Sequence, residues 1–513
     1  MNNGKVNVTK VTAASNQAFY SDMAMIFRTA SLLMFCFCWE GLIRPLSAQH
    51  REDAARTRPV RITGSLRTRV EMWDWFEGSA DNRYGFSGNF LRLNLTQTRG
   101  NMDWQLDLAA PFLLGLPGRA IAAAPQAQFG LGATYFAANN ARQNTAMIFP
   151  KQGFLRWKGL FGDETQSVRI GRFEWMDGGE VTPKDSTLSA VKRDRVNQRL
   201  IGPFMWTHVG RSFDGFHYTM NRPKLNVTWV GAMATRGAFQ VDGWGQLKTG
   251  FSTLSATRQT GDANNAGEWR LSAIYFHDWR RVLKTDNRPL AARQADMGNI
   301  RLATFTGHYM HNTRTGAGSF NVLLWGAVQT GRWGAMDHQA YAYNLEGGWQ
   351  PQKMSRLKPW LQAGLARGSG DGDPNDGRHG TFHQLLPTPR PFARTPFYNM
   401  MNSDDFFGML TLRPHQKLTL RSEYHAIRLA SRADLWYTGG GPFQPWTFGY
   451  AGRGTGGARS VANLWDVSCD INLNAHVAFT GYLGHMQGRA AVRRIYPRDG
   501  SGNFGYLELT YRF

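Results

Sequence analysis

The sequence predicts an all-β fold: a transmembrane antiparallel β-barrel of the bacterial outer-membrane type. Its last residues, LELTYRF, alternate strictly between apolar and polar side chains, which is the period of a strand with one apolar face. The chain ends on an aromatic residue, Phe513. Outer-membrane barrels pair their last strand with their first, and their assembly machinery reads a C-terminal aromatic, so we expect Phe513 to be an assembly signal. The composition agrees, because 57 Gly and 13% aromatic residues stand beside only 19% charged residues.

An apolar run at residues 30–39 is too short to span a membrane as a helix but fits a secretory signal. Small residues follow at Ser47 and Ala48, which predicts cleavage before Gln49. Residues 1–48 are therefore expected to be an N-terminal extension and a cleaved signal peptide, with translation starting at Met1, Met23 or Met25. Residues 49–513 are expected to form a single barrel domain in the bacterial outer membrane. The mature chain keeps one cysteine, which excludes an internal disulfide.

The mature chain is strongly basic, since removal of residues 1–48 leaves 55 Lys and Arg against 35 Asp and Glu, a net charge of +20. Three partners fit such a charge: nucleic acid, the phosphates of lipopolysaccharide in the outer-membrane lipid, or anions moving through a lumen. Nucleic acid is disfavoured, because the arginines are dispersed among alternating strands behind an export signal. The other two partners stay open.

Alternation recurs along the whole mature chain. Leu91, Leu93 and Leu95 alternate with polar residues, and similar segments lie near residues 104–108, 155–158, 417–425 and 465–473. Charges on the opposite face would be intolerable in a packed core, so they imply a wide, wet interior. At about 10 residues per strand plus turns and loops, the mature length accommodates roughly 16 to 20 strands. Long loops are expected at residues 110–150, 176–197, 367–404 and 437–460, where Gly, Pro, Asn and Asp gather.

Arginine is the residue type expected to line an anion pathway, because its planar guanidinium stays charged and binds carboxylates bidentately. Strand parity places one group on the inner face, and a second group lies in or beside the segment RDRVNQRLIGPFMWTHVGRSFDG and is a candidate constriction. For each single arginine, an ion pair that stiffens the wall is an equal alternative. The first group is Arg67, Arg69, Arg92, Arg156, Arg169, Lys417 and Arg421, and the second is Arg193, Arg195, Arg199 and Arg211.

An acidic stretch carries oxygen ligands at Asp371, Asp373, Asn375 and Asp376, in a spacing that partly resembles a calcium loop. Its glycine comes one place late, and Phe382 stands where a bidentate Glu is needed. A turn-rich loop is therefore favoured, with calcium as the alternative and no other cofactor expected. Enzymatic motifs are absent or weak: GRSFDG is not a nucleophile elbow and no HExxH occurs. We expect no enzyme.

The stretch GLARGSGDGDPNDGRHGTFHQLLPT at residues 364–388 resembles the SGD…DG…F…L-P-T segment of the alginate-export family of outer-membrane barrels. VRIGRFEW at residue 168, RLIGPFMWTHVGRSFDG at residue 199 and the C-terminal segment fit the same family. The resemblance implies a monomeric barrel of about 18 strands whose prototype passes anionic alginate outward through an arginine-rich pore. The sequence thus favours a channel for anionic polysaccharide or related anionic solutes. The alternatives are a diffusion porin for small anions or sugars and, in another class, a barrel enzyme or adhesin.

Overall fold

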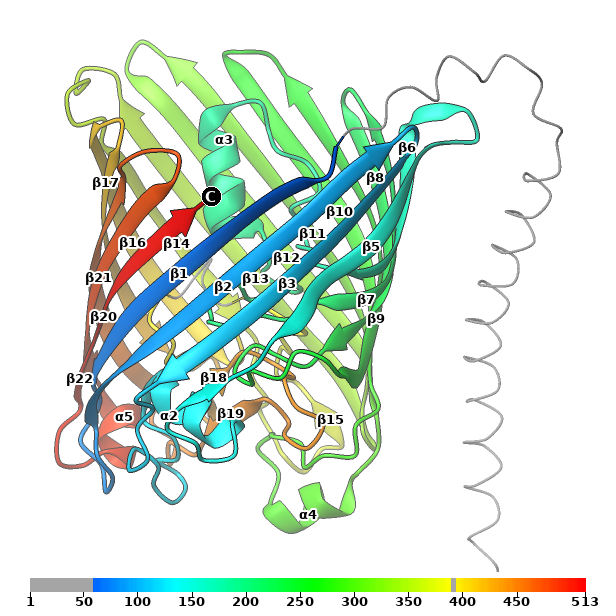
Figure 1. Ribbon diagram of the computed structural model, residues 1–513. Helices are drawn as coiled ribbons and strands as arrows, with labels where there is room; N and C mark the ends of the chain where they lie inside the picture. Colours follow the sequence, from blue (N-terminus) through cyan, green and yellow to red (C-terminus); the bar gives the residue numbers. More distant parts are fainter. Residues whose placement is uncertain (1–58, 389–393) are drawn as a thin grey trace, which may run out of the picture. The chain divides into compact units, whose positions relative to one another are not determined.

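The computed structural model describes residues 59–388 and 394–513, so the expected signal peptide lies outside the described residues. Within them, one sheet of 20 strands contains 18 long strands that form a closed antiparallel barrel, as the sequence predicted (Figure 1). The other two, β4 and β15, are two-residue pieces. The barrel closes where β1 pairs with β22, from Ser65 opposite Arg512 to Asp74 opposite Asn503. In the described part of the chain, no helix is long and apolar enough to cross a membrane.

The spanning strands follow one another around the barrel in sequence order. They are β1 (Arg61–Asp74), β2 (Arg83–Arg99), β3 (Met102–Leu114), β5 (Phe149–Leu160), β6 (Asp163–Phe173), β7 (Phe213–Arg222), β8 (Leu225–Thr235), β9 (Gln246–Gly261), β10 (Asn265–Asp278), β11 (Ile300–Thr315), β12 (Gly318–Trp333), β13 (Met336–Pro351), β14 (Trp360–Gly368), β16 (Ser403–His415), β17 (Leu418–Arg428), β20 (Ser460–Asn472), β21 (Val477–Gly488) and β22 (Ser501–Arg512). The remaining elements are β4 (Thr145–Ala146), β15 (Arg378–His379), β18 (Trp436–Gly439), β19 (Tyr450–Arg453), α2 (Gly130–Ala138), α3 (Ser186–Val191), the π-helical turn η3 (Lys192–Val196), α4 (Leu290–Ala295) and α5 (Ala490–Ile495).

The outer face of the barrel is apolar because every second strand residue points outward. On β12, Leu324 and Val328 are 47% and 56% exposed, whereas Trp325 and Ala327 between them are buried. The predicted outward residue Leu155 is likewise 42% exposed. An exposed apolar belt of this kind is stable only against lipid, so the alternation read from the sequence marks the membrane-facing surface.

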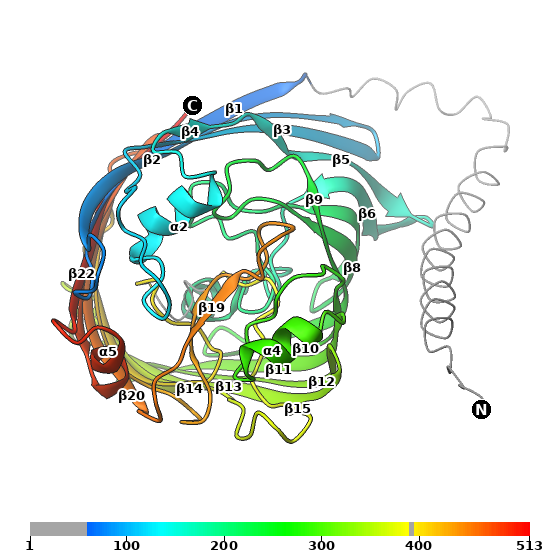
Figure 2. The same cartoon turned by 90° about the horizontal axis from the view of Figure 1, so that it is seen from below.

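The two ends of the barrel differ in the length of their connections. At the end of the barrel where β1 begins and β22 ends, consecutive strands are joined by short turns such as residues 100–101, 161–162 and 316–317. At the other end the connections include residues 115–148, 174–212, 279–299, 369–402 and 429–459, close to the predicted loops. Short turns are periplasmic and long loops extracellular in bacterial barrels, which orients the chain in the outer membrane. Figure 2, a view onto the long-loop end, shows several of these loops inside the ring of strands.

Candidate functional site

The connection between β6 and β7, residues 174–212, folds into the barrel and is called the lumen loop. It carries α3, which Figure 1 shows inside the ring of strands. The Asp185 carboxylate caps α3 by accepting a hydrogen bond from the Leu188 amide at 2.9 Å, and it also accepts one from Asn312 and pairs with Arg314. Asn312 and Arg314 lie near the periplasmic end of β11. The lumen loop therefore starts at the extracellular end of the barrel and reaches the periplasmic end of its wall.

A second extracellular connection pairs with the lumen loop. The amide of Gly202 donates to the carbonyl of Leu386 at 2.8 Å, and the amide of Leu386 donates to the carbonyl of Leu200 at the same distance. These two bonds form a parallel bridge between Ile201 and Leu386, and the amide of Thr388 separately donates to the carbonyl of Gln198 at 2.9 Å. We call the lumen loop, together with residues 369–388 and 394–402, the plug. Because the plug covers inward-facing strand residues, the interior is less open than the wide, wet lumen expected from the sequence.

Buried ion pairs attach the plug to the barrel wall. Arg195 pairs with Glu346 of β13 at 2.8 Å, with the two side chains 4% and 1% exposed. Lys192 pairs with Glu268 of β10 at 2.6 Å. Burial lowers the pKa of the Lys192 ammonium, and the neighbouring Glu268 carboxylate opposes this change. Removing one member of a buried pair leaves an uncompensated charge, so these pairs hold the plug in one position.

Two further arginines of the wall form ion pairs with the plug. Arg270 of β10 contacts Asp177 at 2.7 Å and Glu180 at 2.7 Å. Arg421 of β17 contacts Asp194 at 3.1 Å, which confirms that Arg421 faces inward. The plug is thereby connected to β10, β13 and β17 of the wall.

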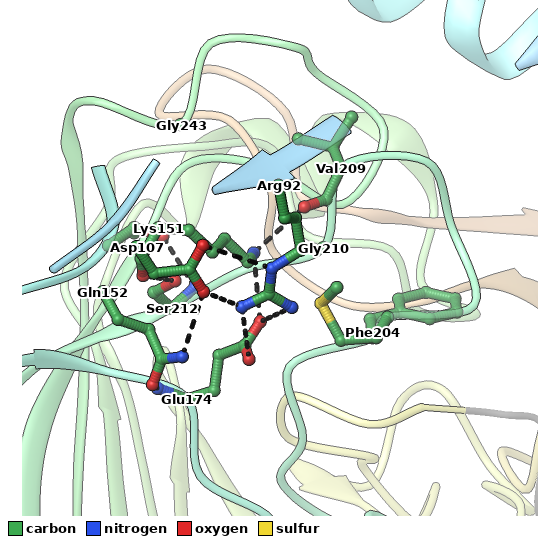
Figure 3. A network of polar contacts seen from close by, with 12 residues as sticks. Arg92, Asp107, Lys151, Gln152, Glu174, Phe204, Val209, Gly210, Ser212 and Gly243 are labelled. Carbon is green, nitrogen blue, oxygen red and sulfur yellow. Dashed lines mark hydrogen bonds and ion pairs between the residues drawn. The ribbon is translucent and has the colours of Figure 1, made fainter. Parts of the chain in front are cut away.

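A polar network fixes the two ends of the lumen loop (Figure 3). Arg92 of β2 pairs with Asp107 of β3 and with Glu174, the first residue of the loop, at 3.1 Å. Near the loop's last residues, the Lys151 ammonium donates to the carbonyl of Val209 at 3.0 Å. These contacts tie the start and the end of the loop to the same wall, so the loop is held as a closed hairpin across the lumen.

The closing seam of the barrel carries another inward cluster. Arg69 donates to Glu508 of β22 at 2.6 Å and contacts Glu71 at 3.3 Å. Its guanidinium lies over the ring of Trp206 from the lumen loop, with 4.5 Å to the ring centroid. Arg67 donates to the carbonyls of Met205 and Thr207. Both arginines face inward as predicted, and both use their donors on protein groups.

A row of basic side chains crosses β5, β6 and β7 on the inner face. Arg156 lies directly opposite Arg169, and Arg169 lies directly opposite His217. The Arg169 Nε–H donates to His217 Nδ1 at 2.9 Å, which places the histidine proton on Nε2. All three residues are partly exposed. Among the described residues, neither Arg156 nor Arg169 has a carboxylate within ion-pairing distance.

This arrangement is unfavourable without an anion, because like charges directly opposite each other on neighbouring strands repel. Aromatic rings support the guanidiniums: Arg169 lies 4.4 Å from the ring centroid of Phe173, and Arg156 lies 5.6 Å from that of Phe154. Arg169 also donates from Nη2 to the carbonyl of Glu174 at 3.1 Å. An approaching carboxylate would therefore meet the fork of Arg156 and the Nη1 side of Arg169 on an apolar support. We call Arg156, Arg169 and His217 the basic row.

The predicted constriction residues have mostly structural contacts. Arg199 is fully buried over the ring of Trp325, and it donates to the carbonyl of Arg195. Arg211 is 1% exposed and donates to the carbonyl of Gly440 at 2.6 Å. Together with Arg195, these side chains contact protein rather than a passing solute in this conformation. Arg193 differs, because its side chain is 61% exposed beside Asp194.

Two other predicted positions lie away from the inner wall. Lys417 is exposed in the periplasmic turn between β16 and β17, one residue before β17 begins. The prediction that it lies on the inner face is therefore wrong. Phe513 follows the last residue of β22, where its amide donates to the carbonyl of Gly64 at 3.0 Å. The Gly64 amide returns a bond of 2.8 Å to the Phe513 carbonyl, so the terminal residue takes part in closing the barrel.

The acidic loop forms a series of turns. Each of Asp371, Asp373 and Asp376 accepts a hydrogen bond from a backbone amide two residues further on, that of Asp373, Asn375 and Arg378 respectively. Burial, with the Asp434 carboxylate nearby, raises the pKa of Asp371 to about 6. Within residues 59–388 and 394–513, no three His, Cys, Asp or Glu side chains are grouped to hold a metal ion.

The sequence reasoning missed the carboxylates that partner the arginines. Glu508, Asp107 and Glu346 each lie on the inward face of a strand and neutralise a predicted basic residue. The sequence signal that could have found them is strand parity, because these carboxylates occupy inward-facing positions of alternating strands, as the arginines do. Glu174 carried no such signal, because it lies just beyond the end of β6.

The fold agrees with comparisons to known proteins. The family model described as Alginate export matches residues 150–502. No curated protein sequence matches the chain. Similar crystal structures share the fold at low sequence identity. The outer membrane protein OpdK of Pseudomonas aeruginosa has a TM-score of 0.50 at 10% identity, covering 88% of this chain and 99% of its own, and OpdK with vanillate has a TM-score of 0.52 at 10% identity, covering 88% and 98%. OccAB4 of Acinetobacter baumannii has a TM-score of 0.51 at 8% identity, covering 89% and 99%.

Proposed function

Because the chain belongs to the alginate export family and forms an 18-strand outer-membrane channel, we propose that it passes anionic solutes, with polyuronate-like polysaccharide as the preferred class. The basic row carries this proposal. Arg156 and Arg169 face each other without a carboxylate partner among the described residues, so a solute carboxylate would relieve their repulsion. The proposal includes a monomeric barrel that is inserted by the barrel-assembly machinery.

A lumen suited to transport needs sites that are weak and repeated, since one tight site would stall a polymer. The neutralised cluster at Arg92, whose side chain is 20% exposed, meets this need, because Asp107 and Glu174 compete with the solute for the same donors. The basic row is the stronger site, supported by two guanidiniums and a neutral imidazole. Passage of a chain-like solute additionally requires the plug to move.

A diffusion porin for small anions is the second candidate, and the plug favours it. In the described conformation the lumen loop crosses the interior and is fixed at both ends by Arg92 and Lys151. A small carboxylate needs less displacement of this loop than a polymer does. OpdK, one of the structurally similar proteins, was crystallised with vanillate, which is a small carboxylate.

Planar-bilayer recordings under a salt gradient test the proposal. The wild-type reversal potential is expected to indicate anion selectivity that weakens as salt rises, because a Debye length of about 10 Å at 0.1 M shrinks to about 3 Å at 1 M. Polyuronate added to one side is expected to block the current reversibly, and neutral oligosaccharide to block less. A monocarboxylate that blocks as well as polyuronate would favour the small-anion porin.

The variant Arg156→Gln/Arg169→Gln is expected to weaken the polyuronate block about tenfold, because hydrogen bonds to charged groups contribute about 1.5–3 kcal/mol. The matched control is Arg83→Gln/Arg332→Gln, which removes equal charge from exposed positions paired with Asp74 and Asp337 at the extracellular rim. A cation-selective or non-conducting wild-type protein would contradict the proposal. So would a variant whose selectivity and block match those of the control.

A further inference from the structure

Arginines gather on one arc of the extracellular rim, over β14, β16, β17 and the ends of β20 to β22. We call this group the arginine arc. All but Arg367, whose side chain is 30% exposed, are exposed residues. The group is Arg367, Arg428, Arg459, Arg489, Arg493 and Arg498.

The arc faces the membrane rather than the lumen. Arg428 has the outward parity of Tyr424, which is 48% exposed, and Arg367 has the outward parity of Leu361, which is 45% exposed. The Arg428 guanidinium lies 5.9 Å from the ring centroid of Phe406, an outward residue that is 47% exposed. The charge thus lies immediately above the apolar belt, at the height of lipid headgroups.

Protein carboxylates neutralise only part of this charge. Asp404 is shared by Arg367 at 3.2 Å and Arg459 at 2.9 Å. Arg428 lies opposite Asp404 in the strand register but forms no ion pair with any described residue. Two guanidiniums on one carboxylate, with a third beside them, leave a local positive excess.

Arg489, Arg493 and Arg498 form the second half of the arc, which lies around a small pocket in the connection between β21 and β22. The pocket has a volume of about 290 Å³, and its lining includes Arg493, Arg498 and Gln487. Gln487 has the outward parity of Leu483, which is 62% exposed. Helix α5, which carries Arg493, lies at the rim of the barrel in Figure 2. Asp499 also lines the pocket, and Glu77 forms a backbone bridge with Asp499. These two carboxylates are fewer than the three arginines Arg489, Arg493 and Arg498.

We propose that the arginine arc binds the phosphate groups of lipopolysaccharide in the outer leaflet. The position at the extracellular end of the lipid-facing surface selects a membrane lipid over a solute in the lumen. Guanidinium groups bind phosphate through paired, charge-assisted hydrogen bonds, and several converge here. The Asp404 cluster and the pocket of Arg493 provide two places for phosphate along the same arc. This proposal is independent of what the channel transports.

Binding of fluorescent lipopolysaccharide to the full-length barrel in detergent, with divalent cations removed by chelation, tests the proposal. The variant Arg428→Gln/Arg459→Gln/Arg493→Gln is expected to bind at least about tenfold more weakly, since three charge-assisted contacts are lost. Replacing the same residues by Lys is expected to restore most of the binding, because the charge is kept. Dephosphorylated lipopolysaccharide is expected to bind wild type as weakly as the triple variant does.

The matched control is Arg83→Gln/Arg281→Gln/Arg332→Gln, which removes three exposed arginines elsewhere on the extracellular side and should leave binding unchanged. Heat-modifiable migration on a gel establishes that each variant is folded. If the triple variant does not fold, Arg428→Gln and Arg493→Gln are measured singly, and each must weaken binding. Unchanged binding after these substitutions or after dephosphorylation would overturn the proposal. Soluble polyuronate that competes as strongly as lipopolysaccharide would overturn it by assigning the arc to the polymer.

Discussion

Arg195 of the lumen loop and Glu346 of β13 form a buried ion pair at 2.8 Å across 151 residues of sequence. Glu346 also accepts a hydrogen bond from Asn344 at 2.6 Å, and Arg199 approaches it to 4.0 Å. One carboxylate on the wall therefore compensates two guanidiniums of the plug. This relationship makes Glu346 a single point at which the position of the plug can be tested.

Glu346→Gln is expected to destabilise the seated plug by about 3–5 kcal/mol, because a buried guanidinium is left without its counter-charge. Single-channel conductance should rise, and the lumen loop should become sensitive to protease, while heat-modifiable migration of the barrel stays normal. Arg195→Met/Arg199→Met/Glu346→Leu is the control, since replacing the carboxylate and both guanidiniums by apolar side chains costs less than removing the carboxylate alone. Wild-type conductance and protease resistance in Glu346→Gln would show that the pair does not hold the plug.

Acidification is expected to loosen residues 369–388. His379 and His383 are buried. The side-chain amide of Gln329 on β12 donates to the His383 carbonyl at 2.8 Å and accepts from the His383 backbone amide at 2.9 Å. Burial lowers the pKa of His383 to about 3 and also lowers that of His379. The neighbouring His338 of β13 lowers both pKa values further, and Arg280 and Arg288 add smaller decreases for His383 and His379 respectively. Asp286, bonded to Trp333 at 3.0 Å, is the nearby carboxylate.

The lowered pKa values of the two histidines determine how opening of the loop depends on pH. A histidine that stays neutral when the loop is seated takes up a proton only when the loop opens, so its stabilising effect is complete above pH 6.5. The effect falls as the pH drops below 6.5 and reaches its limit near the folded pKa. At pH 5 the cost for His383 is about 2 kcal/mol, or about 30-fold in the opening equilibrium. His379 acts in the same direction. Conductance should therefore rise between pH 7.5 and pH 5, and His379→Gln/His383→Gln should lose this dependence. Replacing the exposed His485 should keep it.

Deleting Phe513 is expected to lower the amount of folded barrel. The deletion removes two backbone hydrogen bonds to Gly64 and an aromatic ring that a Cβ on Gly64 would meet at 2.3 Å. Phe513→Ala keeps the backbone bonds and separates the two contributions. Heat-modifiable migration of outer-membrane fractions measures the folded amount. Wild-type amounts for both variants would rule out an assembly role for the terminal residue.

Calcium is expected to have little effect on the protein. The side-chain oxygens of Asp371, Asp373 and Asp376 already accept backbone hydrogen bonds, which close the turns without a cation. Calorimetric titration with calcium should give no tight isotherm, and Asp373→Ala should behave as wild type does. A tight isotherm that Asp373→Ala abolishes would instead identify a calcium site.

The sequence by itself determined the barrel, its lipid face and most of its long loops. A period of two fixes which side chains share a face, so Leu155 pointed outward and Arg92, Arg156 and Arg421 inward as expected. The terminal alternation likewise predicted the strand that closes the barrel. These inferences succeed because the pleat of a strand is a local property of the backbone.

Only the tertiary structure decided which inward side chains remain free to meet a solute. Parity could not tell the partly exposed Arg156 from the buried Arg69, because that difference depends on where the lumen loop packs. It also could not predict that Arg195 and Arg211 lie within protein, since their partners are Glu346 and Gly440, far away in sequence. The period of a strand sets the direction of a side chain, whereas its burial is set by long loops folding back from the other end of the barrel.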